Sequence, residues 1–219
     1  MPIKNGVGDY ISFRYEPLYL QGYEHLKTDF KFDINSSAKY SVIYSDVVLD
    51  GGNVVFSPSK QKAIVSDRIF LENPQYDKND LILRLEMLLK TKIIVIPSLK
   101  SDMTGHADGT VRFLNEKTVL CNATPYKNGY EQKIKRLLSM HGLSVIDFPY
   151  FESGGISAVG LYLNYLECEN HIFLPIFGVS QDGTAIEFSN RIWNKKVVPI
   201  KCMSIAENGG DLNCISCEI

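Results

Sequence analysis

Two short segments, far apart in the sequence, carry residue types that could do chemistry together. The first, 102–112 (DMTGHADGTVR), places His106 two residues before Asp108. A histidine beside a carboxylate can be held charged or can transfer protons near neutral pH. Residues two apart on a strand share a face, so we expect His106 and Asp108 to point the same way. The alternative interpretation is a polar loop with a satisfied surface histidine.

The second segment, 208–214 (NGGDLNC), ends in Cys214 and begins with a Gly-Gly turn that would lead into a strand. A thiolate nucleophile needs an approachable, polar position near a base or a cation. Cys214 meets this need better than Cys121 and Cys168, which lie in apolar contexts. Cys217 should point to the opposite face of the same strand. A structural thiol is the alternative interpretation of Cys214.

Two further clusters are weaker. Asp50-Gly51-Gly52-Asn53 follows an apolar run, and paired glycines permit a sharp turn and close approach of a ligand. An ordinary turn, in which Asp50 makes a local hydrogen bond, is the commoner interpretation. In the apolar stretch 162–178 a polar Asn164 interrupts the pattern, and strand packing followed by a turn is the simpler interpretation.

The elements that must position these residues follow a repeat. Short apolar runs are followed by Pro97, Pro149 and Pro199, at spacings of 52 and 50 residues. Proline cannot donate to a β ladder, so each should mark a strand end. Helical patterns precede the runs at 79–90, 129–141 and 182–194. Two β-like runs precede each helix, at 54–57 and 63–66, at 110–114 and 118–122, and at 158–165 and 171–174.

The sequence therefore predicts β-β-α-β units near 53–97, 109–149 and 157–199. None has enough apolar surface to stand alone, so neighbours must stack or close into a ring. A plain α+β sheet with accidental spacing is the alternative. The ends resemble incomplete units, because strand-like stretches lack a helix at 9–15 and 41–49 and a last strand is expected at 212–219. No linker is evident, so we expect one domain over 1–219.

Composition argues against several classes of function. The chain has 23 Lys+Arg and 25 Asp+Glu, and without a basic block this near balance argues against binding nucleic acid or an anionic membrane. No apolar run reaches the ~18–20 residues that cross a bilayer. Five cysteines without paired zinc-ligand spacing favour free thiols in a reducing compartment, such as the cytoplasm. Nucleotide-loop, zinc-protease and hydrolase-elbow motifs are absent, so we expect no metal and no cofactor.

The four clusters, in this order, resemble the agmatine deiminase and bacterial peptidyl-arginine deiminase family of the guanidine-modifying superfamily. The matching elements are LDGGN at 49–53, GHADGTVRF at 105–113, YLNYL at 162–166 with LPIFG at 174–178, and GGDLNC at 209–214. The resemblance implies an α/β fold, a pentein-type propeller of β-β-α-β units around a pseudo-five-fold axis. The repeat in the sequence agrees with this fold independently.

The resemblance also implies a reaction. It is the hydrolytic deimination of a guanidino group in agmatine, arginine or peptidyl arginine, which yields a ureido product and ammonia through a covalent thiouronium intermediate, without a cofactor. Cys214 would be the nucleophile, His106 the general acid/base, and Asp108 the residue that holds the guanidinium. Asp50 stands where agmatine deiminases usually have Glu, which shortens its reach. The substrate-binding candidates are Asp50, Asn53, Asp102, Arg112, Asn164 and Gly210.

The family carries an Arg-Asp-x-x-Pro segment whose Asp grips the guanidinium, whereas this chain opens Met1-Pro2-Ile3. We therefore expect the chain to lack the N-terminal part of a family-length protein. We also expect impaired activity of the chain alone, and self-association into a homo-oligomer through open strand edges. Two alternatives stay open: a non-catalytic ring protein that binds a partner, and an amidinotransferase that uses the same residues.

Overall fold

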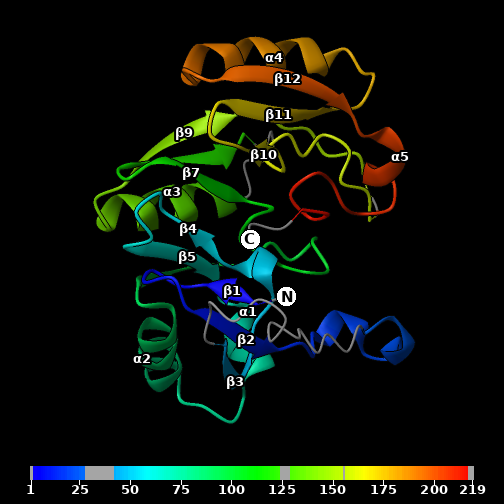
Figure 1. Cartoon of the computed structure of the whole chain (residues 1–219). Helices are drawn as coiled ribbons and strands as arrows, with labels where there is room; N and C mark the ends of the chain where they lie inside the picture. Colours follow the sequence, from blue (N-terminus) through cyan, green and yellow to red (C-terminus); the bar gives the residue numbers. More distant parts are fainter. Residues whose placement is uncertain (1, 28–41, 124–128, 155, 217–219) are drawn as a thin grey trace. The chain divides into compact units, whose positions relative to one another are not determined.

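The computed structural model divides the chain into two compact units, and it describes residues 2–27, 42–123, 129–154 and 156–216 (Figure 1). The first unit comprises residues 1–107 and 113–117, and the second comprises residues 108–112 and 118–219. Among the described residues, no helix combines the length and the apolar character needed to cross a bilayer.

The first unit contains two three-stranded sheets with the same pattern of pairing. In each sheet the first two strands are antiparallel and the last two are parallel. The strands are β1 (Ile3–Lys4), β2 (Tyr10–Arg14) and β3 (Val42–Val48) in one sheet, and β4 (Val55–Phe56), β5 (Lys62–Ser66) and β6 (Lys92–Ile96) in the other. The remaining elements are helices α1 (Arg68–Glu72) and α2 (Lys78–Leu89) and the 3-10 turns η1 (Leu18–Leu20), η2 (Glu24–Leu26) and η4 (Gly51–Asn53).

Helix α2 forms where the sequence predicts it, because its leucines repeat every four residues. Leu81, Leu85 and Leu89 are buried, and they pack in one apolar cluster with residues of β2, β3, β5, α1 and β6. Asp77 caps the helix by accepting a hydrogen bond from the amide of Asn79 at 2.8 Å. The cap therefore lies two residues before residue 79, where the predicted helical pattern begins.

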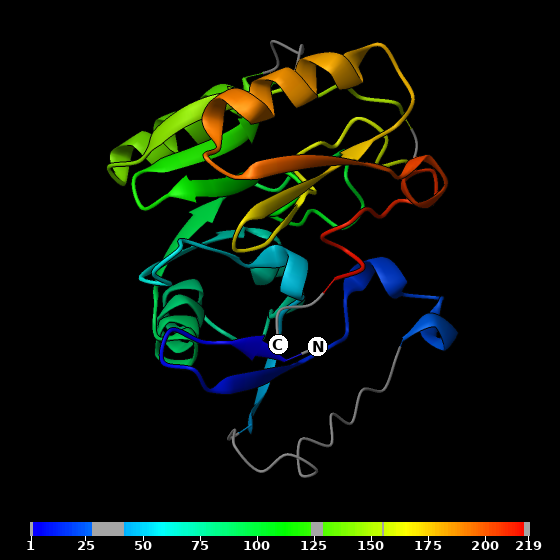
Figure 2. The ribbon, with the colours of Figure 1, turned by 45° about the horizontal axis from the view of Figure 1, so that its top comes forward.

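The second unit repeats the β-β-α-β order twice. Its strand orders are β7-β8-β9 and β10-β11-β12, and the division between the units passes through β7. The strands are β7 (Val111–Asn115), β8 (Thr118–Asn122), β9 (Ser144–Phe148), β10 (Leu166–Glu167), β11 (His171–Ile176) and β12 (Lys196–Lys201). The helices are α3 (Tyr130–Met140), α4 (Gln181–Ile192) and α5 (Met203–Ala206). Helix α4 lies along β12 in both views (Figures 1 and 2).

An aromatic cluster joins the parts of the second unit. The ring of Phe148, at the end of β9, lies 6.4 Å from that of Tyr165, 5.4 Å from that of Phe188 and 5.7 Å from that of Trp193, between centroids. Tyr165 is fully buried. Burial of such rings contributes most to the packing of a small core, so this cluster fixes the segment that precedes β10.

Three strand predictions in this unit were wrong. Residues 158–165 form turns, because Gly160 has a φ of +97° and a Cβ there would lie 2.1 Å from the carbonyl oxygen of Phe151. Pro199 does not end its strand: among the described residues β12 pairs with β11 alone, which makes it an edge strand, and an edge tolerates proline. Residues 212–215 form turns rather than a strand, and 217–219 lie outside the described residues.

Candidate active site

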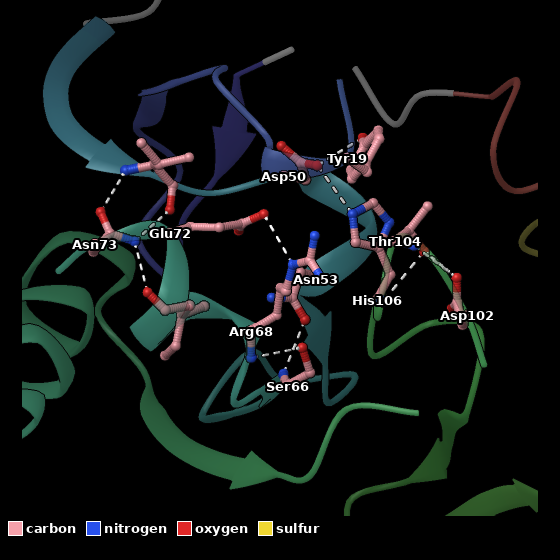
Figure 3. A network of polar contacts seen from close by, with 12 residues as sticks. Tyr19, Asp50, Asn53, Ser66, Arg68, Glu72, Asn73, Asp102, Thr104 and His106 are labelled. Carbon is pink, nitrogen blue, oxygen red and sulfur yellow. Dashed lines mark hydrogen bonds and ion pairs between the residues drawn. The ribbon is translucent and has the colours of Figure 1, made fainter. Parts of the chain in front are cut away.

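Asp50 and His106 meet in the first unit (Figure 3). Asp50 follows β3 in extended conformation, and its side chain is 5% exposed. Its Oδ2 lies 3.0 Å from Nε2 of His106 and accepts a hydrogen bond from the hydroxyl of Tyr19 at 2.9 Å. The side chain makes no capping bond to η4, so the interpretation of Asp50 as a local turn former was wrong. The carboxylate of Asp50 instead contacts the imidazole of His106.

The segment that carries His106 is a loop, because β7 begins only at Val111. The prediction that His106 and Asp108 share a strand face was therefore wrong. Asp102 shapes the loop locally, since its Oδ1 accepts hydrogen bonds from the amide and the hydroxyl of Thr104, at 2.9 and 2.8 Å. Figure 3 shows Thr104 next to His106, whose amide donates to the Thr104 hydroxyl at 3.4 Å. Asp102 thus orders the backbone in front of His106.

Asn53 fixes the same loop from the other side. It is 1% exposed, and its Oδ1 accepts hydrogen bonds from the amide of Ser66 at 2.9 Å and from that of Ala107 at 3.2 Å. This side chain therefore ties the end of β5 to the residue after His106. The structure gives Asn53 this structural role, and its predicted binding of substrate stays a prediction.

A buried ion pair lies in the same network (Figure 3). Arg68 Nε donates to Glu72 Oε1 at 3.3 Å, and both residues come from α1. Burial raises the pKa of Glu72, and the negative charge of Asp50 raises it further, whereas Arg68 opposes the shift. Asp50 and Glu72 therefore repel each other electrostatically, and Arg68 provides the compensating positive charge.

Cys214 lies in the second unit on a turn that Asn164 holds. Asn164 is 1% exposed, and its Oδ1 accepts hydrogen bonds from the amides of Asn213 at 2.9 Å and Cys214 at 3.2 Å. Its Nδ2 lies 3.3 Å from the sulfur of Cys214. Asn164 therefore fixes both the backbone and the thiol of the candidate nucleophile.

Asp108 belongs to the same unit and acts on the same thiol. Asp108 is 7% exposed, and its Oδ2 accepts a hydrogen bond from Nδ2 of Asn213 at 2.9 Å. Desolvation raises the pKa of Cys214, and the negative charge of Asp108 raises it further. Although Cys214 is exposed, its surroundings favour the neutral thiol when no cation is bound. A positive charge close to Asp108 would oppose this effect.

Arg112 contacts the backbone on both sides of Asn164. Its Nη1 donates to the carbonyl oxygen of Tyr165 at 3.0 Å and lies 3.5 Å from that of Leu163, and its guanidinium stacks 4.4 Å from the ring centroid of Tyr165. These carbonyls flank Asn164 in the chain. Arg112, predicted to bind substrate, thus holds the backbone that presents Asn164. A Cβ on Gly210, the remaining candidate, would lie 3.6 Å from that of Cys214, which is an ordinary contact.

We expect replacement of Asn164 by alanine to loosen the Cys214 turn. The change removes two acceptor contacts and the bond to sulfur, which should destabilise the protein by about 1–3 kcal/mol. Amide hydrogen exchange at Asn213 and Cys214 measures the loosening directly. Asn190→Ala serves as the control, because Asn190 is exposed and bonds only its own helix at Ile186. Unchanged exchange at both amides in Asn164→Ala would contradict this role.

Asp211, three residues before Cys214, is a buried acid that the sequence did not single out. It is 0% exposed, its Oδ1 accepts the amide of Leu212 at 2.8 Å, and its Oδ2 has no hydrogen-bond partner among the described residues. Burial raises its pKa from the usual 3.8 to about 6. Burial also raises the pKa of Cys202, with a further contribution from the charge of Asp211, to about 12. Burial in this turn therefore favours the neutral, protonated form of the Asp211 carboxyl group.

Asp211→Asn should stabilise the protein above pH 6. A carboxyl with a raised folded pKa contributes stability that is complete below its unfolded pKa and is lost as the pH rises through about 6. Removing the charge should therefore raise the free energy of unfolding by up to about 3 kcal/mol near pH 8 and by almost nothing near pH 4. Denaturant unfolding of the variant and of the exposed control Glu207→Gln at both pH values measures the effect. A loss of stability near pH 8 would refute the argument.

Among the residues that sequence reasoning missed in these two networks are Tyr19, Glu72 and Asp211. Tyr19 lies in η1, within a stretch without periodicity, and nothing in its neighbourhood signals a partner 31 residues away. Glu72 could have been noticed as an (i, i+4) pair with Arg68. Asp211 stood inside the segment chosen for Cys214, where its charge between a glycine pair and an apolar residue is the available signal.

A protein-family model and several solved structures match this chain. The family model described as Porphyromonas-type peptidyl-arginine deiminase matches residues 8–219. The agmatine deiminase of Campylobacter jejuni is similar in structure, with a TM-score of 0.70 at 19% identity over 94% of this chain and 66% of that one. The agmatine deiminase of Enterococcus faecalis gives a TM-score of 0.73 at 19% identity, over 94% of this chain and 68% of that one. No curated protein sequence matches.

These likenesses confirm the predicted fold, in which small mixed sheets of β-β-α-β units build a pentein-type α/β structure. The chain spans about two thirds of the length of the solved structures. The family match covers all four segments on which the sequence resemblance rested. Each candidate site residue therefore lies within the matched region.

Proposed function

Because the chain belongs to the Porphyromonas-type peptidyl-arginine deiminase family, we propose that it hydrolyses a guanidino group to a ureido group and releases ammonia. The candidate substrates are agmatine, arginine and peptidyl arginine. The observation that supports the proposal is a contact in the second unit: Asn213, next to Cys214, donates a hydrogen bond to the Asp108 carboxylate at 2.9 Å, and the charge of Asp108 acts on the Cys214 thiol. A thiol can attack an electrophilic carbon, and a neighbouring carboxylate can bind the positive charge of the group that contains this carbon.

The first step is the attack of Cys214. A guanidinium is planar and remains protonated in water, so a carboxylate can hold it by charge-assisted hydrogen bonds. Binding the cation at Asp108 offsets the effects that disfavour the thiolate, and the thiol proton passes to a base. The sulfur then bonds to the central carbon. Ammonia leaves with a proton, and a covalent S-amidino thioether remains.

We assign the proton transfers to His106. Its imidazole is 18% exposed at the side chain, so it is open to a ligand, and Asp50 orients it through Nε2 at 3.0 Å. As an acid it gives the leaving ammonia its proton, and as a base it takes a proton from the attacking water. Addition of that water and loss of the thiolate yield the ureido product. The convergence of His106 with Cys214, which belong to different units, stays a prediction.

The proposal is tested by incubating the purified protein with agmatine, with arginine, and with peptides that carry arginine internally or at the C-terminus. We expect ammonia release and conversion of guanidino to ureido groups, detected by mass spectrometry, for at least one substrate class. The four substrates separate the three classes. Product formation only when an acceptor amine is added would indicate amidino transfer instead. Absence of turnover with all four substrates would refute deimination.

A further inference from the structure

Tyr19 and His106 share a single oxygen of Asp50. We propose that Tyr19 is a positioning residue that sets the proton affinity of His106 by competing for the Asp50 carboxylate. The inference rests on the proposed function, in which His106 moves the protons. It assigns to an N-terminal tyrosine a part in the reaction that neither its sequence context nor the family match indicates.

The geometry places both contacts on one atom. Tyr19 donates its hydroxyl to Asp50 Oδ2 at 2.9 Å, and Nε2 of His106 lies 3.0 Å from the same oxygen. The other oxygen, Oδ1, is buried and has no hydrogen-bond partner among the described residues. The aromatic ring of Tyr19 also meets the imidazole edge-on, with 5.9 Å between centroids. Tyr19 therefore fixes the carboxylate and covers one side of the histidine (Figure 3).

The hydroxyl of Tyr19 remains a donor over the working pH range. Burial raises the pKa of Tyr19 well above its usual value, and the charge of Asp50 and the hydrogen bond to it raise the pKa further. The hydroxyls of Tyr15 and Tyr19 lie 3.4 Å apart. Because Tyr19 donates to Asp50, Tyr15 is the donor in that second contact. A short chain of hydroxyls thus ends on the carboxylate.

Other charged groups of the first unit also act on Asp50. Glu72 repels its charge, and Arg68, paired with Glu72 at 3.3 Å, offsets that repulsion. Of the charged and titratable groups here, Tyr19 and His106 contact the carboxylate directly and Glu72 acts on it through charge, whereas Arg68 pairs with Glu72 and Tyr15 contacts Tyr19. Tyr19 differs from Arg68 and Glu72 because it hydrogen-bonds directly to the oxygen that faces the imidazole.

The direction of the effect follows from competition. A donor on a carboxylate oxygen disperses its negative charge, so the oxygen supports the imidazolium less strongly. Removing the Tyr19 hydroxyl takes the competing donor away from Oδ2, the oxygen that His106 contacts. The protonated form of His106 then gains stability, and its titration midpoint rises. A tyrosine that only filled space would leave the midpoint unchanged.

The experiment compares Tyr19→Phe with the parent protein by nuclear magnetic resonance of isotope-labelled histidine. The chain has 4 histidines, and loss of a signal in His106→Gln assigns the resonance of His106. We expect the His106 midpoint to rise by about half a pH unit or more in Tyr19→Phe. Tyr23→Phe is the matched control, because Tyr23 is 58% exposed and faces His25 on the same segment. It should leave the midpoint of His106 in place.

An unchanged or lowered His106 midpoint in Tyr19→Phe would overturn the inference. Thermal unfolding accompanies the titration, and because phenylalanine keeps the ring, we expect a folded variant. The titration does not need turnover, so it separates the two proposals. A protein without activity on any guanidino substrate whose midpoint still rises refutes deimination but supports the role of Tyr19. An active protein with an unmoved midpoint refutes only the role of Tyr19.

Discussion

Cys214→Ala should abolish deimination, with turnover lowered by roughly 10,000-fold or more, while the fold stays intact. The sulfur forms the covalent intermediate, and the other described cysteines offer no substitute. Burial raises the pKa of Cys121 and Cys202 to about 12, so both are inert at neutral pH. Cys168 is exposed but lies at the turn between β10 and β11. Turnover is measured as ammonia release.

Thiol labelling tests the same residue without turnover. A haloacetamidine carries a positive charge, so the Asp108 carboxylate should attract it, and Cys214 should react faster with it than with the neutral haloacetamide. Because burial and Asp108 raise the thiol pKa, labelling by the neutral reagent should accelerate as the pH rises above neutrality. Cys168→Ala is the control and should keep both rates and turnover. Comparable turnover in Cys214→Ala and in the parent would exclude the thiol mechanism.

The sequence predicted the elements wherever a local period had one interpretation. The leucine stripe of α2, the apolar run of β6 before Pro97, and β8 at 118–122 all formed as expected. The strand predicted at 158–165 was wrong. A buried turn with apolar side chains has the same composition as a buried strand, so composition cannot distinguish the two. There Tyr162, Leu163 and Tyr165 are buried without a β ladder.

The sequence names candidate site residues, but it does not predict the contacts that the structure shows. His106 was expected to share a strand face with Asp108, whereas it lies on a loop where its Nε2 is 3.0 Å from Asp50. Asp50 and His106 are 56 positions apart, and no local pattern encodes such a contact. Asn164 was predicted to bind substrate, and its contacts with the Cys214 turn need tertiary structure to be seen.

Asn53, Asp102 and Arg112 show that a polar side chain near a motif can have a structural role that the sequence does not reveal, while their predicted binding of substrate stays a prediction. Each makes hydrogen bonds to backbone groups of the loops that carry the chemistry. Buried backbone groups must be satisfied, and a loop has no ladder to satisfy them, so polar side chains do it. A site built on loops therefore recruits polar residues for support as well as for substrate.

Asp50→Asn should lower turnover by about 100- to 10,000-fold, because it removes the charge that orients His106 and stabilises its protonated form. An amide at this position keeps the size of the side chain, so the fold should survive. Without the carboxylate the titration midpoint of His106 falls, and the histidine loses its proton at a lower pH. The step that protonates the leaving ammonia then fails first on the alkaline side. The alkaline limb of the activity profile should move to lower pH.

The control is Asp46→Asn, which neutralises an exposed carboxylate four residues earlier on β3. Asp46 pairs with Arg84 at 2.7 Å and with Tyr76 on the surface, so its loss should leave turnover and the His106 midpoint unchanged. The two changes next to the imidazole have opposite signs: Asp50→Asn lowers its midpoint, whereas Tyr19→Phe raises it. Loosening of the loop would move both variants in the same direction. Opposite shifts therefore identify charge, rather than packing, as the means by which Asp50 and Tyr19 control His106.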